Sequence, residues 1–302
     1  MKSTAELLVG GAGSGRRVPT WAAGLIDALS RDLPVVLTRG DLRARLSEVG
    51  SDRDVEATVT ELRRLGWLVG LPIRGTWAFV PPGQVGLVDP YLALRGWLAR
   101  QPDMPLMLAG ASAAWHLGYL DRAPEGPTSI WLPHGTRLPD GLRPYATVVQ
   151  IRWSPQAIGL VGPSTKFLLR RRLDLISWSN GVPAFGPEAL LAQLGARPAS
   201  FGPWADLVTH LGAIVADCDD ERLVKLLEHH TLSTWQRVGY LLHAGGDHNR
   251  GVALLDLRRD KVLPKVRFDR AGPIGDTPGV YASDFHLIDR LVAPLQSVIG
   301  KA

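Results

Sequence analysis

The stretch at residues 38–66, TRGDLRARLSEVGSDRDVEATVTELRRLG, decides the fold of the first part of the chain. It opens with a T-x-x-D capping pattern, which predicts a helix whose apolar residues recur at positions 42, 46 and 49. Gly50 ends this helix, and Ser51 and Asp54 repeat the capping pattern at once. Two capped helices separated by a short glycine turn are typical of a helix-turn-helix, so we expect a second helix that begins at Ser51 and runs to about residue 65.

The sequence on either side of this stretch completes a winged helix-turn-helix over residues 20–83. A helix is predicted for residues 21–30, with Thr20 as its N-cap, followed by a short strand at residues 35–37. After Gly66, the strand-like runs WLVGL and TWAFV are separated by PIRG, which predicts a hairpin with Arg74 near its tip. A hairpin at this place is expected to be the wing, which contacts phosphate or the minor groove.

The outer face of the helix expected at residues 51–65 carries the side chains that would read DNA. At about 100° per residue, four positions face away from its apolar residues, and they are the predicted base contacts: Arg53, Ala57, Thr60 and Arg64. The arginines can pair with guanine O6 and N7, and the small residues between them allow the helix to approach the floor of the major groove. The predicted phosphate contacts are Arg39, Arg43 and Arg74.

The charge of this module is low for a DNA-binding domain. Residues 1–85 hold 11 Lys and Arg against nine Asp and Glu, a net charge of +2. Several of the carboxylates lie at helix starts, where the helix dipole favours them, and so we favour DNA over a protein partner for this face. In the whole chain, whose net charge is +5, only six of the 34 basic residues are lysine. Arginine suits bidentate contacts to phosphate and guanine, although a GC-rich genome would produce the same bias.

A proline- and glycine-rich segment at residues 81–90, PPGQVGLVDP, predicts the domain boundary. Residues 1–19 are expected to form a flexible arm, and residues 89–302 a larger second domain that opens with a helix at 91–100. Strand-like runs follow at 128–132, at 146–153 and near 173–178, and helical periodicity prevails from Pro187 onward. The predicted fold class is therefore α+β: an N-terminal winged helix-turn-helix, then an α+β domain with a small sheet and a helical C-terminal part.

The second domain offers no pattern typical of a catalytic or metal site. Its clustered histidines at 229, 230, 243 and 248 lack ligand spacing, and Cys218 lies between two aspartates, which disfavours a thiolate. We expect no enzyme activity and no cofactor. Residues 130–175 hold seven Lys and Arg against two Asp, and within them Arg170, Arg171 and Arg172 are candidates for contact with nucleic acid or a protein partner. A second basic segment, 250–270, is left open between function and a solvated surface.

Four segments resemble, in this order, the AbiEi-type antitoxins of type IV toxin–antitoxin systems. They are IRGTWAFVPPG, GASAAWHLGYLDRAPEGPTSIWLP, GVPAFGPEALLAQLGARP and DERLVKLLEHHTLSTWQRVGYLLHAGG. The resemblance implies a repressor that binds inverted repeats in its own promoter and counteracts a co-encoded toxin with a nucleotidyltransferase fold. It implies that the C-terminal domain is the antitoxin domain, and it carries no catalytic residues. Direct binding of the toxin, its modification and opposition at its target all stay open.

An alternative is a ligand-responsive winged-helix regulator unconnected to a toxin. A neighbouring gene for a nucleotidyltransferase-like protein would distinguish the two. No run approaches 18 apolar residues, the first residues lack the apolar core of a secretory signal, and there is one cysteine. These features predict a cytoplasmic protein without a membrane span.

Overall fold

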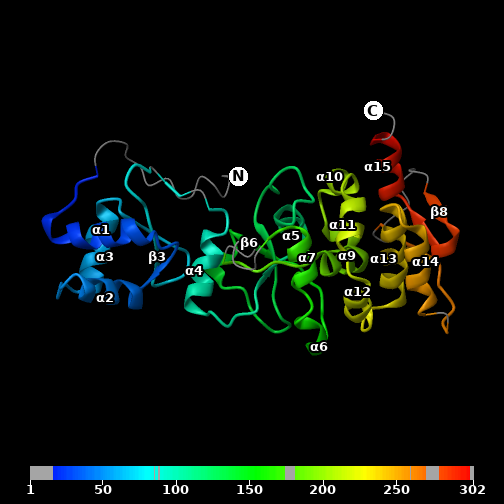
Figure 1. The fold of residues 1–302 in the computed structure, drawn as a ribbon, viewed down its shortest axis with the longest axis horizontal. Helices are drawn as coiled ribbons and strands as arrows, with labels where there is room; N and C mark the ends of the chain where they lie inside the picture. The colour runs from blue at the N-terminus through cyan, green and yellow to red at the C-terminus, as the bar shows by residue number, and fades with distance from the viewer. Residues whose placement is uncertain are drawn as a thin grey trace. The chain divides into compact units, whose positions relative to one another are not determined.

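The chain folds as two compact units, seen in the computed structural model of Figure 1. The structure describes residues 16–84, 86–87, 89–173, 181–258, 260–269 and 279–299. The first unit comprises Met1–Pro105, Glu125–Thr128 and Arg137–Ala146, and the second Leu106–Pro124, Ser129–Thr136 and Thr147–Ala302. Helices and small sheets occur together, so the predicted α+β class is confirmed. None of the helices in these ranges combines the length and the apolar character needed to cross a membrane.

Three helices and a short 3₁₀ turn open the first unit: η2 (Thr20–Ala22), α1 (Ala23–Asp32), α2 (Arg39–Glu48) and α3 (Val55–Arg64). A capping box begins α2, in which Thr38 N donates to Asp41 Oδ2 at 2.7 Å and Asp41 N donates back to Thr38 Oγ1 at 3.3 Å. These two bonds satisfy donors that a helix start leaves unpaired, so the predicted start of α2 is confirmed.

The start of α3 corrects the prediction that this helix begins at Ser51. The N-cap is Asp54, which accepts a hydrogen bond from Ala57 N at 2.9 Å, and the helix begins at Val55. Gly50 has a φ of 67°, the left-handed conformation that ends α2, and the chain needs residues 51–53 to turn between the helices. Ser51 therefore lies in the turn and not at the start of the helix.

A three-stranded antiparallel sheet covers these helices. Its strands are β1 (Leu37–Thr38), β2 (Leu68–Gly70) and β3 (Thr76–Phe79), in the order β1-β3-β2. The predicted hairpin is present between β2 and β3. Apolar side chains from α1, α2, α3 and the sheet form one core: Leu25, Leu29, Leu37, Leu42, Leu46, Val59, Leu62, Trp67 and Phe79.

Helix α4 (Leu92–Arg100) also belongs to the first unit, although the sequence analysis placed residues 91–100 in the second domain. It packs on β1 and β3. The contact is close at Gly96, where an added Cβ would lie 3.0 Å from Leu71 Cδ1 and 3.2 Å from Thr76 Oγ1. A glycine at this position therefore brings α4 onto the base of the hairpin. A 3₁₀ turn, η3 (Asp140–Leu142), completes the unit.

A second small sheet, with most of its residues in the second unit, has the order β4-β5-β6. Its strands are β4 (Met107–Leu108), β5 (Thr128–Trp131) and β6 (Ala146–Val148), and α5 (Gly110–His116), α6 (Pro155–Ile158) and α7 (Thr165–Arg170) accompany it. The strand-like run at 128–132 corresponds to β5. The run at 146–153 is a strand only as far as Val148. The run near 173–178 falls mostly outside the described residues.

Helices dominate the rest of the second unit, as predicted. They are α9 (Pro187–Ala196), η4 (Pro198–Ser200), α10 (Trp204–Val208), α11 (Leu211–Asp217), α12 (Asp220–Leu227), α13 (Leu232–Ala244) and α14 (His248–Asp256). Every residue of α9 from Pro187 to Gly195 is buried, and α5, α11, α12 and α13 pack around it (Figure 1). A third sheet, β7 (Val266–Arg267), β9 (Leu287–Asp289) and β8 (Val280–Ala282), lies with η5 (Ser283–Phe285) and α15 (Val292–Ile299) at the C-terminal end.

Candidate nucleic-acid interface

The outer face of α3 holds three of the four predicted base contacts. Ala57, Thr60 and Arg64 are exposed and share the face opposite the buried Val55, Val59 and Leu62. Arg53 is exposed as well, but it precedes the N-cap and so lies before the helix. Its guanidinium carbon lies 3.9 Å from the centre of the Trp21 ring. This stacking holds Arg53 against the first helical segment of the unit, where the helical spacing used for the prediction does not apply.

Arg64 is held by a neighbouring carboxylate on the same helix. Its Nε donates to Glu61 Oε2 at 3.0 Å and its Nη2 to Glu61 Oε1 at 2.7 Å. This hydrogen-bonded pairing lowers the pKa of Glu61 and raises the pKa of Arg64. Arg64 is exposed and Glu61 is partly exposed, and an ion pair in contact with solvent is readily exchanged for another partner. Arg64 is thus oriented on the outer face of α3 by Glu61.

The three predicted phosphate contacts surround this face. Arg39, at the start of α2, forms an ion pair with Glu56 of α3. Arg43 is exposed and borders a shallow hollow at the turn between α2 and α3. Arg74 is exposed at the hairpin, next to Gly75, whose φ of 77° makes the tight turn.

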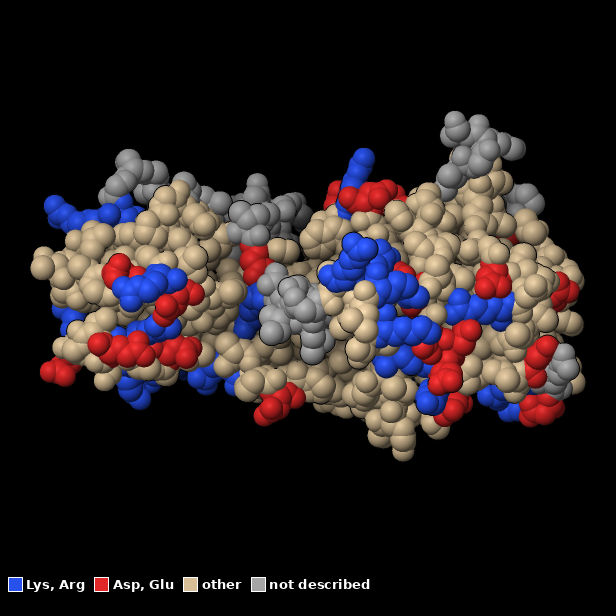
Figure 2. Space-filling view, in the orientation of Figure 1, with Lys and Arg blue, Asp and Glu red and all other residues tan. Residues whose placement is uncertain are grey.

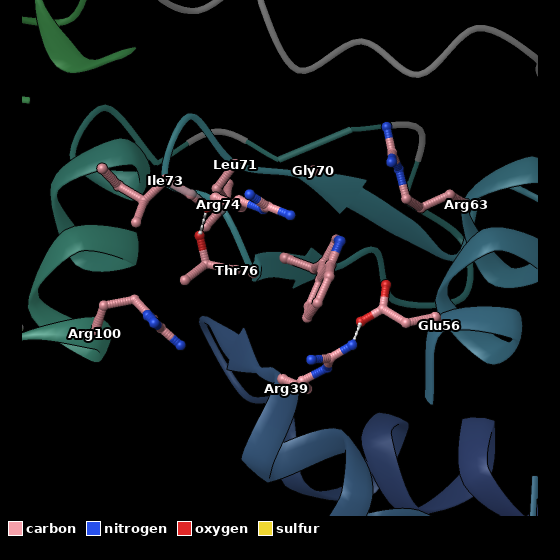
Figure 3. A pocket seen from close by; sticks show the side chains of 11 residues that line it. Arg39, Glu56, Arg63, Gly70, Leu71, Ile73, Arg74, Thr76 and Arg100 are labelled. Carbon is pink, nitrogen blue, oxygen red and sulfur yellow. Dashed lines mark hydrogen bonds and ion pairs between the residues drawn. The ribbon is translucent and has the colours of Figure 1, made fainter. Parts of the chain in front are cut away.

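A hollow of about 660 Å³ lies between α3, the hairpin and the end of α4 (Figure 3). Four arginines line it: Arg39, Arg63, Arg74 and Arg100. The sequence predicts Arg39 and Arg74 as phosphate contacts, but not Arg63 and Arg100. Arg63 lies on the flank of α3, next to the buried side, and Arg100 ends a helix that the sequence analysis assigned to the other domain. No local sequence pattern places Arg100 near the hairpin. Arg100 comes close to Gly75 only because the end of α4 lies beside the hairpin.

The candidate arginines of the second unit are mostly engaged within the unit. Arg170 Nη1 donates to Ala216 O at 2.8 Å, and Arg171 Nε donates to Asp217 Oδ2 at 2.9 Å. Asp217 is buried and also accepts a hydrogen bond from Tyr119 Oη at 2.6 Å. These contacts tie α7 to the end of α11. Arg172 is exposed, with a φ of 55°.

The charged groups of the second unit are dispersed among opposite charges. Figure 2 shows basic side chains gathered near α7, with acidic side chains beside them. The structure therefore brings the predicted base and phosphate contacts together in the first unit, while two members of the Arg170–Arg172 group have structural partners.

Buried titratable groups of the second unit are far from solvent. Burial raises the pKa of Cys218 well above its usual value and also raises the pKa of Glu188, whose Oε1 accepts a hydrogen bond from Asp219 N at 2.8 Å. Glu188 is 0% exposed and Cys218 8%, so neither is placed to meet a substrate. Within the described ranges, no three His, Cys, Asp or Glu side chains gather closely enough to hold a metal ion.

Comparison with known proteins identifies the second unit. The AbiEi antitoxin C-terminal domain matches residues 106–244, and Leu106 is also where the second unit begins. The crystal structure of the Rv2827c protein from Mycobacterium tuberculosis is similar over 97% of this chain and 99% of that chain, with 54% identity and a TM-score of 0.87. The chain belongs to the AbiEi-type antitoxin family. None of the curated proteins matches it.

The match to this antitoxin domain indicates an antitoxin of a toxin–antitoxin system, and the family implies a toxin partner. The matched range lies outside the arginine-lined surface of α3, the hairpin and α4. The chain therefore carries an exposed helix face and a basic hollow in residues N-terminal to the family match.

Proposed function

We propose that this antitoxin binds DNA through a winged helix-turn-helix at residues 20–83 and represses its own operon. The observation that carries the proposal is the combination of topology and surface in the first unit. The element order is α1-β1-α2-α3-β2-β3, the sheet order is β1-β3-β2, and the outer face of α3 carries exposed Ala57, Thr60 and Arg64. This is the order in which a winged helix presents its third helix to the major groove and its hairpin to the backbone.

Recognition would use the side chains of α3 in two ways. Arg64 would exchange Glu61 for guanine O6 and N7, and Thr60 would meet a base edge or a thymine methyl group. Arg53, stacked on Trp21, would contact the duplex beside the start of the helix. Ala57 leaves room for close approach. Arg39, Arg43 and Arg74 would fix the register through the phosphates without reading sequence.

The proposed partners are DNA for the first unit and a toxin for the second unit. Two copies of the chain would occupy inverted repeats in the promoter, since a palindromic site mirrors a two-fold arrangement of protein. The second unit would counteract a co-encoded toxin with a nucleotidyltransferase fold, in a type IV system. Arg172 is the remaining candidate of its group for contact with the toxin or with nucleic acid. Both activities would take place in the cytoplasm.

Binding to the DNA upstream of its own gene tests the first part. With the full chain, Arg64→Ala should lose about 1–3 kcal/mol of discrimination between the operator and operators altered at one guanine, because a bidentate pair disappears. Arg31→Ala is the matched control, since Arg31 is an exposed arginine paired with Asp27 on α1. Specific binding that survives Arg53→Ala combined with Arg64→Ala would contradict the assignment of α3 as the reading helix.

Toxin rescue by the full chain tests the second part. Co-expression with the neighbouring toxin gene should restore growth, and the Arg53→Ala, Arg64→Ala variant should restore it equally well while losing repression. Loss of both activities in this variant, with the protein still folded, would show that the DNA face and the antitoxin function are not separate. Absence of rescue by the wild-type chain would favour a regulator unconnected to a toxin.

A further inference from the structure

The four arginines around the hollow of Figure 3 come from four parts of the first unit. Arg39 begins α2, Arg63 belongs to α3, Arg74 lies at the hairpin and Arg100 ends α4. In Figure 3 the side chains of Arg74 and Arg100 point toward the middle of the hollow, that of Arg39 points toward Glu56, and that of Arg63 points away from the other three. We call this hollow the arginine groove. Its cations are separated along the chain by up to 61 positions, so only the fold assembles them.

Glycines in the hairpin give two of these arginines room to lie against the main chain. An added Cβ at Gly70 would lie 3.5 Å from Arg63 Cζ, and one at Gly75 would lie 3.9 Å from Arg100 Nη1. Both distances are ordinary van der Waals contacts, so each guanidinium group lies directly beside the main chain of the hairpin. The hairpin therefore supports both cations at its surface, and the close contact of Gly96 with Leu71 and Thr76 holds α4 where Arg100 reaches Gly75.

The charge of the arginine groove is strongly positive even though the module as a whole is not. Among the residues that the structure describes, Glu56 is the one carboxylate in its lining, and it is paired with Arg39. Four arginines against one glutamate leave a local charge of +3. Such a concentration of cations at an open surface attracts a polyanion and releases counterions when it binds.

The chemistry of the lining favours phosphate over a whole nucleotide. The volume of about 660 Å³ is within the range, roughly 300–1,000 Å³, of sites that hold small molecules. Trp77, the aromatic residue of the lining, is only 7% exposed, so it has no free ring face on which a base could stack. The hydroxyl of Thr76 donates to Ile73 O at 2.6 Å and is already used. Guanidinium groups are thus the main recognition elements, and they suit phosphate oxygens.

The arginine groove is also next to the proposed reading face. A second, shallower hollow is lined by Thr60, Arg63 and Arg64 together with β2, so Arg63 borders both surfaces. A DNA strand that follows the edge of the major groove from Thr60 would reach Arg63 next.

We propose that the arginine groove binds backbone phosphates of the operator strand, with Arg63 and Arg100 as contacts additional to the winged helix, so that α4 is part of the DNA interface. This rests on the proposed function, because it requires that the chain bind duplex DNA. The phosphate could also belong to a free nucleotide, and the two sources are separated by experiment.

The test measures the salt dependence of DNA binding by the full chain. Fluorescence anisotropy would be recorded with the upstream duplex and with an unrelated duplex of equal length, over a series of NaCl concentrations. Arg63→Ala combined with Arg100→Ala should lower the slope of log K against log salt by about 1.8, because each lost phosphate contact removes about 0.9. Affinity for the two duplexes should fall by the same factor, because phosphates carry no sequence information.

Matched variants separate charge from fold. Arg31→Ala combined with Arg122→Ala removes the same charge from two exposed positions outside the groove and should leave the slope unchanged. Arg100→Lys should keep most of the slope, because counterion release depends on charge. Circular dichroism and thermal unfolding would confirm that each variant is folded.

Three results would overturn the proposal. An unchanged slope in the Arg63→Ala, Arg100→Ala variant, with wild-type binding intact, refutes the groove but leaves the proposed function standing. Failure of the wild-type chain to bind either duplex refutes the proposed function itself. Titration with ATP and with inorganic triphosphate forms the third arm: binding that depends on Arg63 and Arg100, together with an unchanged DNA slope, would assign the groove to a free anion.

Discussion

Arginines serve different ends in the arginine groove of the first unit and among the helices of the second unit. In the first unit, Arg63 and Arg100 lie against glycines at the rim of an open hollow. In the second unit, Arg250 donates through Nη1 to Val215 O at 2.6 Å and through Nη2 to Cys218 O at 2.9 Å, and it also pairs with Asp220. Arg222 donates to Leu160 O at 2.7 Å and to Gly162 O at 2.6 Å.

A basic segment is therefore not in itself a binding surface. A guanidinium group has five N–H donors in a fixed geometry, and main-chain carbonyls left over at helix ends are good acceptors for them. Where such carbonyls are close, the guanidinium group donates its hydrogen bonds within the fold. Where glycines and an open surface surround it, its donors stay exposed at the surface. The number of arginines in a segment does not distinguish these cases.

The largest expected effect is the loss of stability when Asp217, the buried partner of arginines in the second unit, is replaced. Asp217→Ala removes the carboxylate that pairs with Arg171 and accepts from the Tyr119 hydroxyl, and so it leaves a cation and a buried hydroxyl without their partner. Because Asp217 and the Tyr119 hydroxyl are buried while Arg171 is partly exposed, the free energy of unfolding should fall by about 3 kcal/mol, measured by chemical denaturation. DNA affinity at temperatures where the protein is folded should not change.

Tyr119→Phe is the smaller companion change and should cost about 1 kcal/mol, the net value of one hydrogen bond. An unfolding free energy that is unchanged in Asp217→Ala would contradict the structural role given to Arg171.

The substitution Arg250→Lys separates the contribution of charge to stability from that of the guanidinium hydrogen bonds. Lysine keeps the charge but cannot reach Val215 O, Cys218 O and Asp220 together, so the unfolding free energy should fall by about 1.5–3 kcal/mol. The same substitution at Arg100 should leave stability within about 0.5 kcal/mol of the wild type, as is usual at an exposed site. Equal losses at the two positions would break the comparison between the units.

Acidification should lower the stability of the second unit and leave the salt dependence of DNA binding by the arginine groove unchanged. Burial lowers the pKa of His230, which packs edge-on against Trp153, and the neighbouring charge of His229 lowers it further. The unfolded chain then binds this proton more readily than the folded one, so stability falls as the pH drops below about 6.5 toward the lowered pKa. Denaturation midpoints between pH 7.5 and 5 should decrease for the wild type and decrease less for His230→Phe.

Arginines do not titrate in this range, so the salt slope of DNA binding should stay constant between these pH values. A slope that rises on acidification would indicate that histidines contribute to the DNA interface.

The smallest expected effect is a gain. Glu56→Gln removes the carboxylate that opposes phosphate in the arginine groove and frees Arg39, and so it should tighten binding of any duplex by a few-fold at low salt. Glu48→Gln is the matched control, since Glu48 is an exposed carboxylate of α2 paired with Arg45 outside the groove. Equal gains from both would mean that only net charge matters.

Local patterns were sufficient for the start of α2, the outer face of α3 and the hairpin of the first unit. The capping box of α2, the apolar spacing of α3 and the PIRG turn each depend on neighbours within four residues, and interactions of that range can be recognised in the sequence. The exposed face of Ala57, Thr60 and Arg64 follows from the same periodicity. Arg53 was misplaced because both Ser51 and Asp54 suit an N-cap, and the choice between them depends on the path of the turn.

What the sequence determined by itself is the order of elements, the family and the outward face of α3. The family follows from the resemblance of four segments, and the other two follow from spacing along the chain, which is preserved whatever the elements pack against. The tertiary structure alone decided which arginines are free to bind. Arg171 and Asp217 are 46 residues apart, and Arg39 and Arg100 are 61 apart. Whether a guanidinium meets a carbonyl, a carboxylate or an open groove depends on contacts between distant segments, and only packing brings those segments together.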